Sequence, residues 1–130
     1  MTTVLLDTHV VHWWSAEPDR LSAAAVGAIE DADELAVAAI TWFELAWLAA
    51  HERIAVTIPV RAWLGELAAG VRTFGITPAI AETAVALPSS FPGDPADRLI
   101  YATAVERGCG LVTKDGRMRR HRHPRKLTVW

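Results

Sequence analysis

The chain has 130 residues, of which 52% are hydrophobic and 22% are charged, and its formal net charge is −2. These values fit one folded domain with a substantial core, and they argue against a disordered chain or an integral membrane protein. A single cysteine, Cys109, excludes a disulfide framework and favours a reducing cytoplasm. We therefore expect one domain over residues 1–130, without a signal peptide or a membrane span.

Apolar periodicity and capping residues predict alternating strands and helices along the chain. In chain order, we expect a strand over residues 3–6, helices over 9–16 and 22–31, a strand over 35–40, helices over 41–53 and 59–70, a strand over 73–76, helices over 78–87 and 95–107, and strands over 110–113 and 127–129. This alternation indicates an α/β fold of three α/β/α layers around a central, mainly parallel sheet of four to five strands.

Four acidic residues fall where this arrangement brings strand ends and helix starts to one edge. Asp7 ends the first strand, and Glu44 lies in the first turn of the helix after the second strand. Asp97 lies in the first turn of the helix after the loop PSSFPGDP, and Asp115 follows the fourth strand. Ligands bind at this edge of an open parallel sheet, so the four carboxylates are expected to converge in one cleft.

Most of these acids also have a simpler structural interpretation. Thr41 and Glu44 match a capping box, in which both side chains bind free amide groups at the start of a helix. Asp94 fits an N-cap, and Asp97 fits a first-turn acid that interacts with the helix dipole. Asp115 fits a simple turn. None of these interpretations explains why the acids all fall at the same predicted edge.

Carboxylates that cluster repel each other. Two unit charges about 4 Å apart repel by roughly 4 kcal/mol at an effective dielectric constant of about 20. The acids would therefore raise one another's pKa values or move apart unless a cation lies among them. An all-oxygen set without Cys or paired His suits Mg²⁺ or Mn²⁺ rather than zinc. Such an ion lowers the pKa of a bound water and neutralises phosphate charge, which indicates metal-assisted phosphodiester hydrolysis.

Positive charge is concentrated at the end of the chain. Residues 1–113 have a charge balance of −8, whereas residues 114–130 have a balance of +6. A basic segment of this kind is typical of a phosphate-binding surface, and a solvated tail that offsets the acidic remainder explains it equally well. The residues proposed to contact phosphate are Lys114, Arg117, Arg119, Arg120 and Arg122.

The motifs described above resemble those of the PIN-domain ribonucleases, and within them the VapC-type toxins of toxin–antitoxin pairs. The resemblance covers nearly the whole chain. It rests on LLDTH at residues 5–9, Glu44 in its apolar helix, DPADRLI at residues 94–100 and LVTKD at residues 111–115. The DPxDRLI run followed about a dozen residues later by LVTxD is the most specific part.

Carried over position by position, the resemblance implies that the catalytic and metal-binding acids are Asp7, Glu44, Asp97 and Asp115. It implies that three of them hold Mg²⁺ or Mn²⁺ while Glu44 assists or positions the water, which leaves a 5′-phosphate and a 3′-hydroxyl. Asp94 is then an accessory ligand or only a helix cap.

The resemblance also suggests roles for residues beside the acids. Thr8 and Thr113 are expected to orient the carboxylates. Arg98 is expected to pair with a site carboxylate or to contact phosphate. Some relatives carry a His shortly before the DP pair, whereas this chain has Phe91-Pro92-Gly93, so no role for such a His transfers.

As partners, the resemblance implies single-stranded or loop RNA, a second copy of the chain and a small antitoxin. The tryptophans that gather near the predicted helices form either a partner surface or plain core; they are Trp13, Trp14, Trp42 and Trp47. A phosphatase of the haloacid dehalogenase type is disfavoured, because its second Asp would stand where this chain has His9. A binding module that has lost its chemistry is disfavoured by the presence of all four acids.

Overall fold

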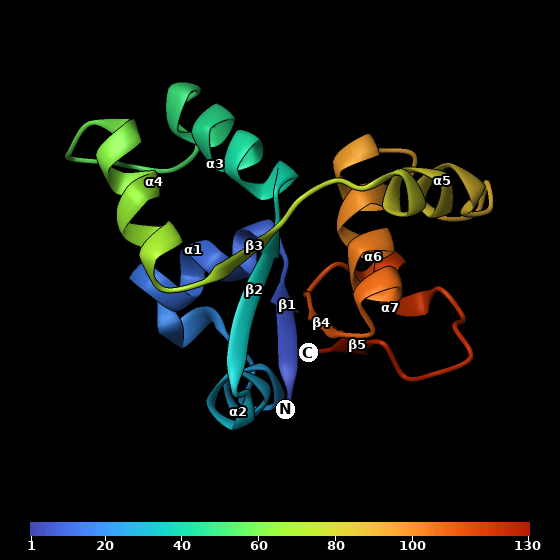
Figure 1. Ribbon diagram of the computed structural model, residues 1–130. Coiled ribbons are helices and arrows are strands. Elements are labelled where there is room, and N and C mark those ends of the chain that lie inside the picture. Colours follow the sequence, from blue (N-terminus) through green and yellow to red (C-terminus); the bar gives the residue numbers. More distant parts are fainter.

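The computed structural model describes residues 1–130 (Figure 1). The strands are β1 (Thr3–Leu6), β2 (Glu34–Ala38), β3 (Arg72–Phe74), β4 (Gly110–Val112) and β5 (Thr128–Val129). The helices are α1 (Thr8–Ala16), α2 (Ala23–Asp31), α3 (Ile40–Ala50), α4 (Val60–Ala69), α5 (Pro78–Ala86), α6 (Pro95–Arg107) and α7 (Gly116–Arg120), with a 3₁₀ turn η1 (Pro18–Arg20).

The five strands form one sheet in the order β3-β2-β1-β4-β5, and every neighbouring pair is parallel. β1 is the central strand, with Leu5 opposite Ala36 of β2 on one side and Leu111 of β4 on the other. Because all strands run the same way, the chain leaves β1, β2 and β4 at the same edge of the sheet. The candidate site lies at this edge, where the carboxyl ends of β1, β2 and β4 meet.

Side chains of the central strand alternate between two cores, as the pleat of a strand requires. Leu5 packs in a core that α6 and α7 cover, with Ile100, Tyr101 and Met118 among its members. Val4 and Leu6 face the opposite core, which is closed by α1, α2, α3 and α4. Figure 1 shows α1, α3 and α4 on one side of the sheet and α5, α6 and α7 on the other. The predicted three-layer α/β/α fold with a parallel sheet is confirmed.

Most predicted elements are present with their ends shifted by a few residues. Ser22 and Asp94 cap α2 and α6 as predicted, and Gly108 ends α6 with a φ of 65°. The prediction that Thr41 caps a helix is wrong, because α3 begins at Ile40 and Thr41 is buried inside it. The short helix α7 and the turn η1 were not predicted. No helix has the length and apolar character needed to cross a bilayer.

Candidate active site

Asp7 leaves β1 and at once caps α1. Its Oδ1 accepts the N–H of Thr8 at 2.8 Å, and its Oδ2 accepts the hydroxyl of Thr113 at 2.7 Å. The residue is only 8% exposed. Asp7 is therefore held by two donors from two different segments, which fixes the direction of a buried carboxylate.

Glu44 lies in the second turn of α3 rather than at its start. Its Oε1 accepts the Thr8 hydroxyl at 2.5 Å, and the same hydroxyl lies 3.2 Å from that of Thr41. The capping-box interpretation of Thr41 and Glu44 is thus wrong: both side chains point to α1 rather than to the amides of their own helix. This contact orients Glu44 toward the end of β1.

Asp94 and Asp115 each cap a helix with one oxygen. Asp94 Oδ1 accepts the N–H groups of Ala96 and Asp97, and Asp115 Oδ1 accepts those of Arg117 and Met118. The prediction that Asp94 is an N-cap is therefore confirmed, and Asp115 caps α7 where a simple turn was predicted. The structure records no hydrogen bond to the second oxygen, Oδ2, of either residue.

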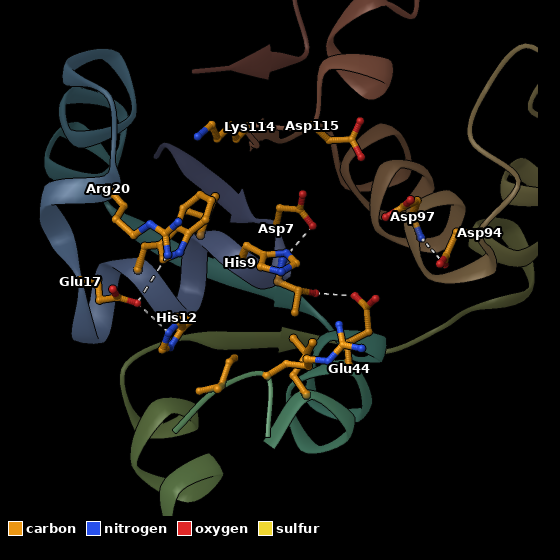
Figure 2. Close-up of a pocket in the computed structure, with 16 residues that line it drawn as sticks. Asp7, His9, His12, Glu17, Arg20, Glu44, Asp94, Asp97, Lys114 and Asp115 are labelled. Carbon is orange, nitrogen blue, oxygen red and sulfur yellow. Dashed lines mark hydrogen bonds and ion pairs between the residues drawn. The ribbon is translucent and has the colours of Figure 1, made fainter. Parts of the chain in front are cut away.

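All these acids line one cleft of about 900 Å³, whose lining includes Asp7, Glu44, Asp94, Asp97 and Asp115. Figure 2 shows Asp7 facing Asp115, Asp97 and Glu44, which come from β4–α7, α6 and α3. The predicted convergence of acids at the carboxyl edge of the sheet is what the structure shows. The helix starts α1 and α6 also meet there, and their dipoles partly offset the negative charge.

The electrostatics of the cleft disfavour several full negative charges. Burial raises the pKa of Asp97 to about 7, and repulsion from the other carboxylates adds to the rise. Burial also raises the pKa of Asp7, although hydrogen bonds from Thr113 and Thr8 oppose this. The pKa of Glu44 is raised by burial against the hydrogen bond from Thr8. Binding of a cation, or protonation of the acids, would therefore relieve the unfavourable negative charge in the cleft.

Arg98 follows Asp97 in the sequence but faces away from the acids. Its guanidinium donates to five backbone carbonyls at the end of α5 and in the loop before α6, those of Ala84, Leu87, Pro88, Phe91 and Pro92. The prediction that Arg98 pairs with a site carboxylate or contacts phosphate is wrong, because all five of its N–H groups are engaged elsewhere. Arg98 instead ties the loop before α6 to the first turn that carries Asp97.

Comparison with known families agrees with this arrangement. The model of the PIN domain matches residues 4–124, which is nearly the whole chain. The chain belongs to the PIN-domain family. Within it, the chain is 75% identical to Ribonuclease VapC22 of Mycobacterium tuberculosis (strain ATCC 25618 / H37Rv) over 130 residues, which cover 100% of both chains. It is therefore a PIN domain of the VapC type, and the phosphatase alternative is set aside.

Solved structures share the fold of this PIN domain at low sequence identity. A toxin–antitoxin complex from Klebsiella pneumoniae contains a chain that is 22% identical, with a TM-score of 0.69 and coverage of 98% of this chain and 96% of that one. DNA-bound VapBC from Salmonella typhimurium contains a chain that is 18% identical, with a TM-score of 0.69 and coverage of 98% and 97%. At these identities the likeness establishes the fold.

The donor set of this PIN domain fits a hard divalent cation. Asp7, Asp97 and Asp115 line the cleft with carboxylate oxygens, which are the ligands that hard divalent cations prefer. No three His, Cys, Asp or Glu side chains are gathered tightly enough to enclose an ion by themselves. Carboxylates that repel each other adopt such a spread arrangement. It suits an ion that keeps several of its waters, as Mg²⁺ does.

The cations of the cleft are only partly those predicted. Lys114 lines it, whereas the other four basic residues of the predicted set lie on α7 or just after it and line smaller hollows. Arg20 and Arg53 line the cleft and were not predicted. No local pattern marks them, because they come from η1 and from the turn after α3, which only tertiary folding brings to Asp7.

The tryptophans belong mostly to the core. Trp13 is 8% exposed, and Trp14 and Trp42 pack against the core of α1 to α4. Trp47 differs, since it is 44% exposed and lies beside Phe43, which is 66% exposed. Both line an apolar groove that adjoins the acidic cleft. Core packing therefore explains three tryptophans, and an exposed aromatic pair remains on α3.

Proposed function

We propose that this protein is a divalent-metal-dependent endoribonuclease that hydrolyses RNA phosphodiester bonds, with residues 1–130 acting as one PIN domain. The observation that carries the proposal is the convergence of Asp7, Glu44, Asp97 and Asp115 in one cleft in which the pKa of three acids is raised. The high sequence identity of the protein to a ribonuclease of the VapC type supports the same activity. A binding module that has lost its chemistry would not need this costly arrangement.

In this proposal Asp7, Asp97 and Asp115 hold the cation, which we propose to be Mg²⁺ or Mn²⁺, and Asp94 contributes mainly as a cap. A bound divalent cation supplies charge neutralisation at the phosphate and a lower pKa for water. Thr8 positions Glu44, whose raised pKa suits it to orient the attacking water and accept its proton. In-line attack on phosphorus breaks the bond to O3′, and that oxygen takes up a proton. The products carry a 5′-phosphate and a 3′-hydroxyl.

The test is metal-dependent cleavage of single-stranded RNA by the purified protein, with product ends identified by phosphatase treatment. We expect Asp7→Asn to lower the rate by about two orders of magnitude or more. Asp31→Asn is the matched control, because Asp31 is an exposed acid on α2 outside the cleft. Equal rates for the Asp7 variant and the wild type would refute the assignment.

We further propose that the protein is the cytoplasmic toxin of a toxin–antitoxin pair and forms a homodimer. The solved structures of the same fold include toxin–antitoxin complexes, which supports an antitoxin partner. The exposed pair Phe43 and Trp47 beside the cleft is suited to receive an apolar partner segment. We expect Phe43→Ser to weaken a complex with the cognate antitoxin and leave RNA cleavage by the free protein intact. Retained affinity in a binding titration would exclude this groove.

The basic residues that follow Asp115 are proposed to hold RNA outside the cleft. Arg117, Arg119 and Arg120 lie on α7, and Arg122 follows it. They are exposed and make no ion pair with an acid. Charge reversal at Arg119 and Arg120 should therefore weaken RNA binding most at low salt.

A further inference from the structure

The cleft has two sides of opposite charge. Figure 2 shows Asp94 and Asp97 on one side of Asp7, and Lys114 and Arg20 on the other. The acidic side and Asp7 account for the proposed cation site. The basic side has no role in that proposal, although it lines the same continuous hollow.

The two cations of the basic side lie against one aromatic ring. The guanidinium carbon of Arg20 lies 5.0 Å from the ring centroid of Trp13, and Lys114 Nζ lies 5.7 Å from it. Trp13 is itself fixed, since it is 8% exposed and packs against Trp130 at 5.9 Å between ring centroids. Cation–π contacts with a rigid ring hold both charges at the cleft wall.

Neither cation is neutralised by the acids nearby. Lys114 makes no ion pair, although Asp115 is its neighbour in the sequence. Arg20 has a single acidic partner, Glu17, at 3.9 Å, and Glu17 also binds His12 at 3.1 Å. The side chains of Arg20 and Glu17 are 57% and 47% exposed, so this pair contributes little. Two cations on one ring repel each other unless an anion lies between them.

The geometry points to a phosphate-binding subsite formed by Arg20 and Lys114 on the Trp13 ring, which holds the RNA phosphate next to the one that is cleaved. This inference rests on the proposed ribonuclease function. A strand whose scissile phosphate lies at the acids must continue along the cleft, and its flanking phosphate then meets the basic wall. The wall also limits how the strand can lie, because the acidic side repels every phosphate that no cation shields.

The test compares Arg20→Gln/Lys114→Gln with a control that removes two positive charges elsewhere, Arg61→Gln/Arg107→Gln, whose residues are exposed and lie outside the cleft. The probe is a single-stranded RNA of about ten nucleotides with one mapped cleavage position. We expect the cleft variant to raise KM roughly tenfold with little change in kcat. The salt dependence of its RNA affinity should fall by about 0.7 in log–log slope for each phosphate that the variant no longer binds.

A second arm identifies the phosphate. A neutral methylphosphonate is placed on either side of the scissile bond, and one of the two positions should raise KM for the wild type and for the control variant but not for the cleft variant. The conservative pair Arg20→Lys/Lys114→Arg should restore most of the RNA affinity.

Three outcomes would contradict these proposals. Unchanged KM and salt slope in the cleft variant, with normal wild-type cleavage, would overturn the subsite proposal and leave the ribonuclease proposal standing. Weakened binding of a protein partner with normal RNA kinetics would also overturn the subsite proposal, whereas absence of wild-type cleavage would refute the ribonuclease proposal itself.

Discussion

The Thr113 hydroxyl donates a 2.7 Å hydrogen bond to Asp7 Oδ2, and it joins two residues that are 106 positions apart in the sequence. The same hydroxyl oxygen accepts the N–H of Asp115 at 3.0 Å. One buried hydroxyl therefore connects the acid that follows β1 to the acid that follows β4. Thr113 therefore helps to fix the position of these two residues relative to each other.

Replacing Thr113 by Val should damage both stability and the site. The change keeps the shape but leaves the buried Oδ2 of Asp7 without its donor, so we expect a loss of about 1–3 kcal/mol in the free energy of unfolding. We also expect weaker Mn²⁺ binding in a calorimetric titration. Thr103→Val is the control, because its buried hydroxyl binds only the carbonyl of Leu99. Equal Mn²⁺ affinity in the two variants would contradict this role.

The metal-free protein should lose stability as pH rises through the range in which Asp97 titrates. Its folded pKa is raised to about 7 from an ordinary value of 3.8. Because the pKa of Asp97 is raised in the folded state, the folded protein keeps this proton at pH values at which the unfolded chain has lost it. The free energy of unfolding therefore falls as pH rises from about 4 to about 7. We therefore expect the Tm of the wild type to fall relative to that of Asp97→Asn between about pH 4 and pH 7. A divalent cation should reduce the difference, and parallel Tm profiles without metal would contradict the prediction.

Asp94→Asn and Asp94→Ala separate a cap from a ligand. Asn keeps the Oδ1 acceptor for the N–H groups of Ala96 and Asp97, so the free energy of unfolding should stay within about 0.5 kcal/mol of wild type. Ala removes the cap and should cost about 1 kcal/mol. Because the cap uses Oδ1, we expect the Asn variant to bind Mn²⁺ within a few-fold of the wild type. A loss of binding as large as that of Asp97→Asn would make Asp94 a ligand.

Arg98→Gln should release the loop between α5 and α6. The substitution removes most of the donors to five carbonyls of that loop and its flanks, and we expect a loss of about 3 kcal/mol in unfolding free energy. Limited proteolysis should then cut near residues 88–93. Arg107→Gln, on the last turn of the same helix, is the control, since that guanidinium lies over Phe74 and away from this loop. Equal protease resistance in both variants would show that the loop does not depend on Arg98.

Local patterns were sufficient for the strands and for the positions of Asp7, Asp97 and Asp115. The apolar run before Asp7, the Asp94-Pro95 helix start and the Gly108 stop each act within a few residues, so the sequence alone predicts them. The convergence of the acids then follows from the parallel sheet.

What escaped prediction depends on contacts between distant segments. Thr41 looks like a cap, but its burial against Thr8 of α1 overrides that local preference. α7 has five residues, too few for a periodic signal, and it is held by Met118, which is fully buried. The partners of Arg98 and the placement of Arg20 and Lys114 against the Trp13 ring are likewise set by tertiary folding.

The central place of β1 has a consequence for how the protein is made. β1 is synthesised well before one of its two neighbours in the sheet, β4. A nascent chain therefore carries Asp7 and Glu44 without Thr113 or Asp115 until the segment around β4 has been synthesised. Long-range pairing of this kind completes late in folding. An enzyme that cuts RNA would thus stay inert beside the message that encodes it until β4 has been made and has paired with β1.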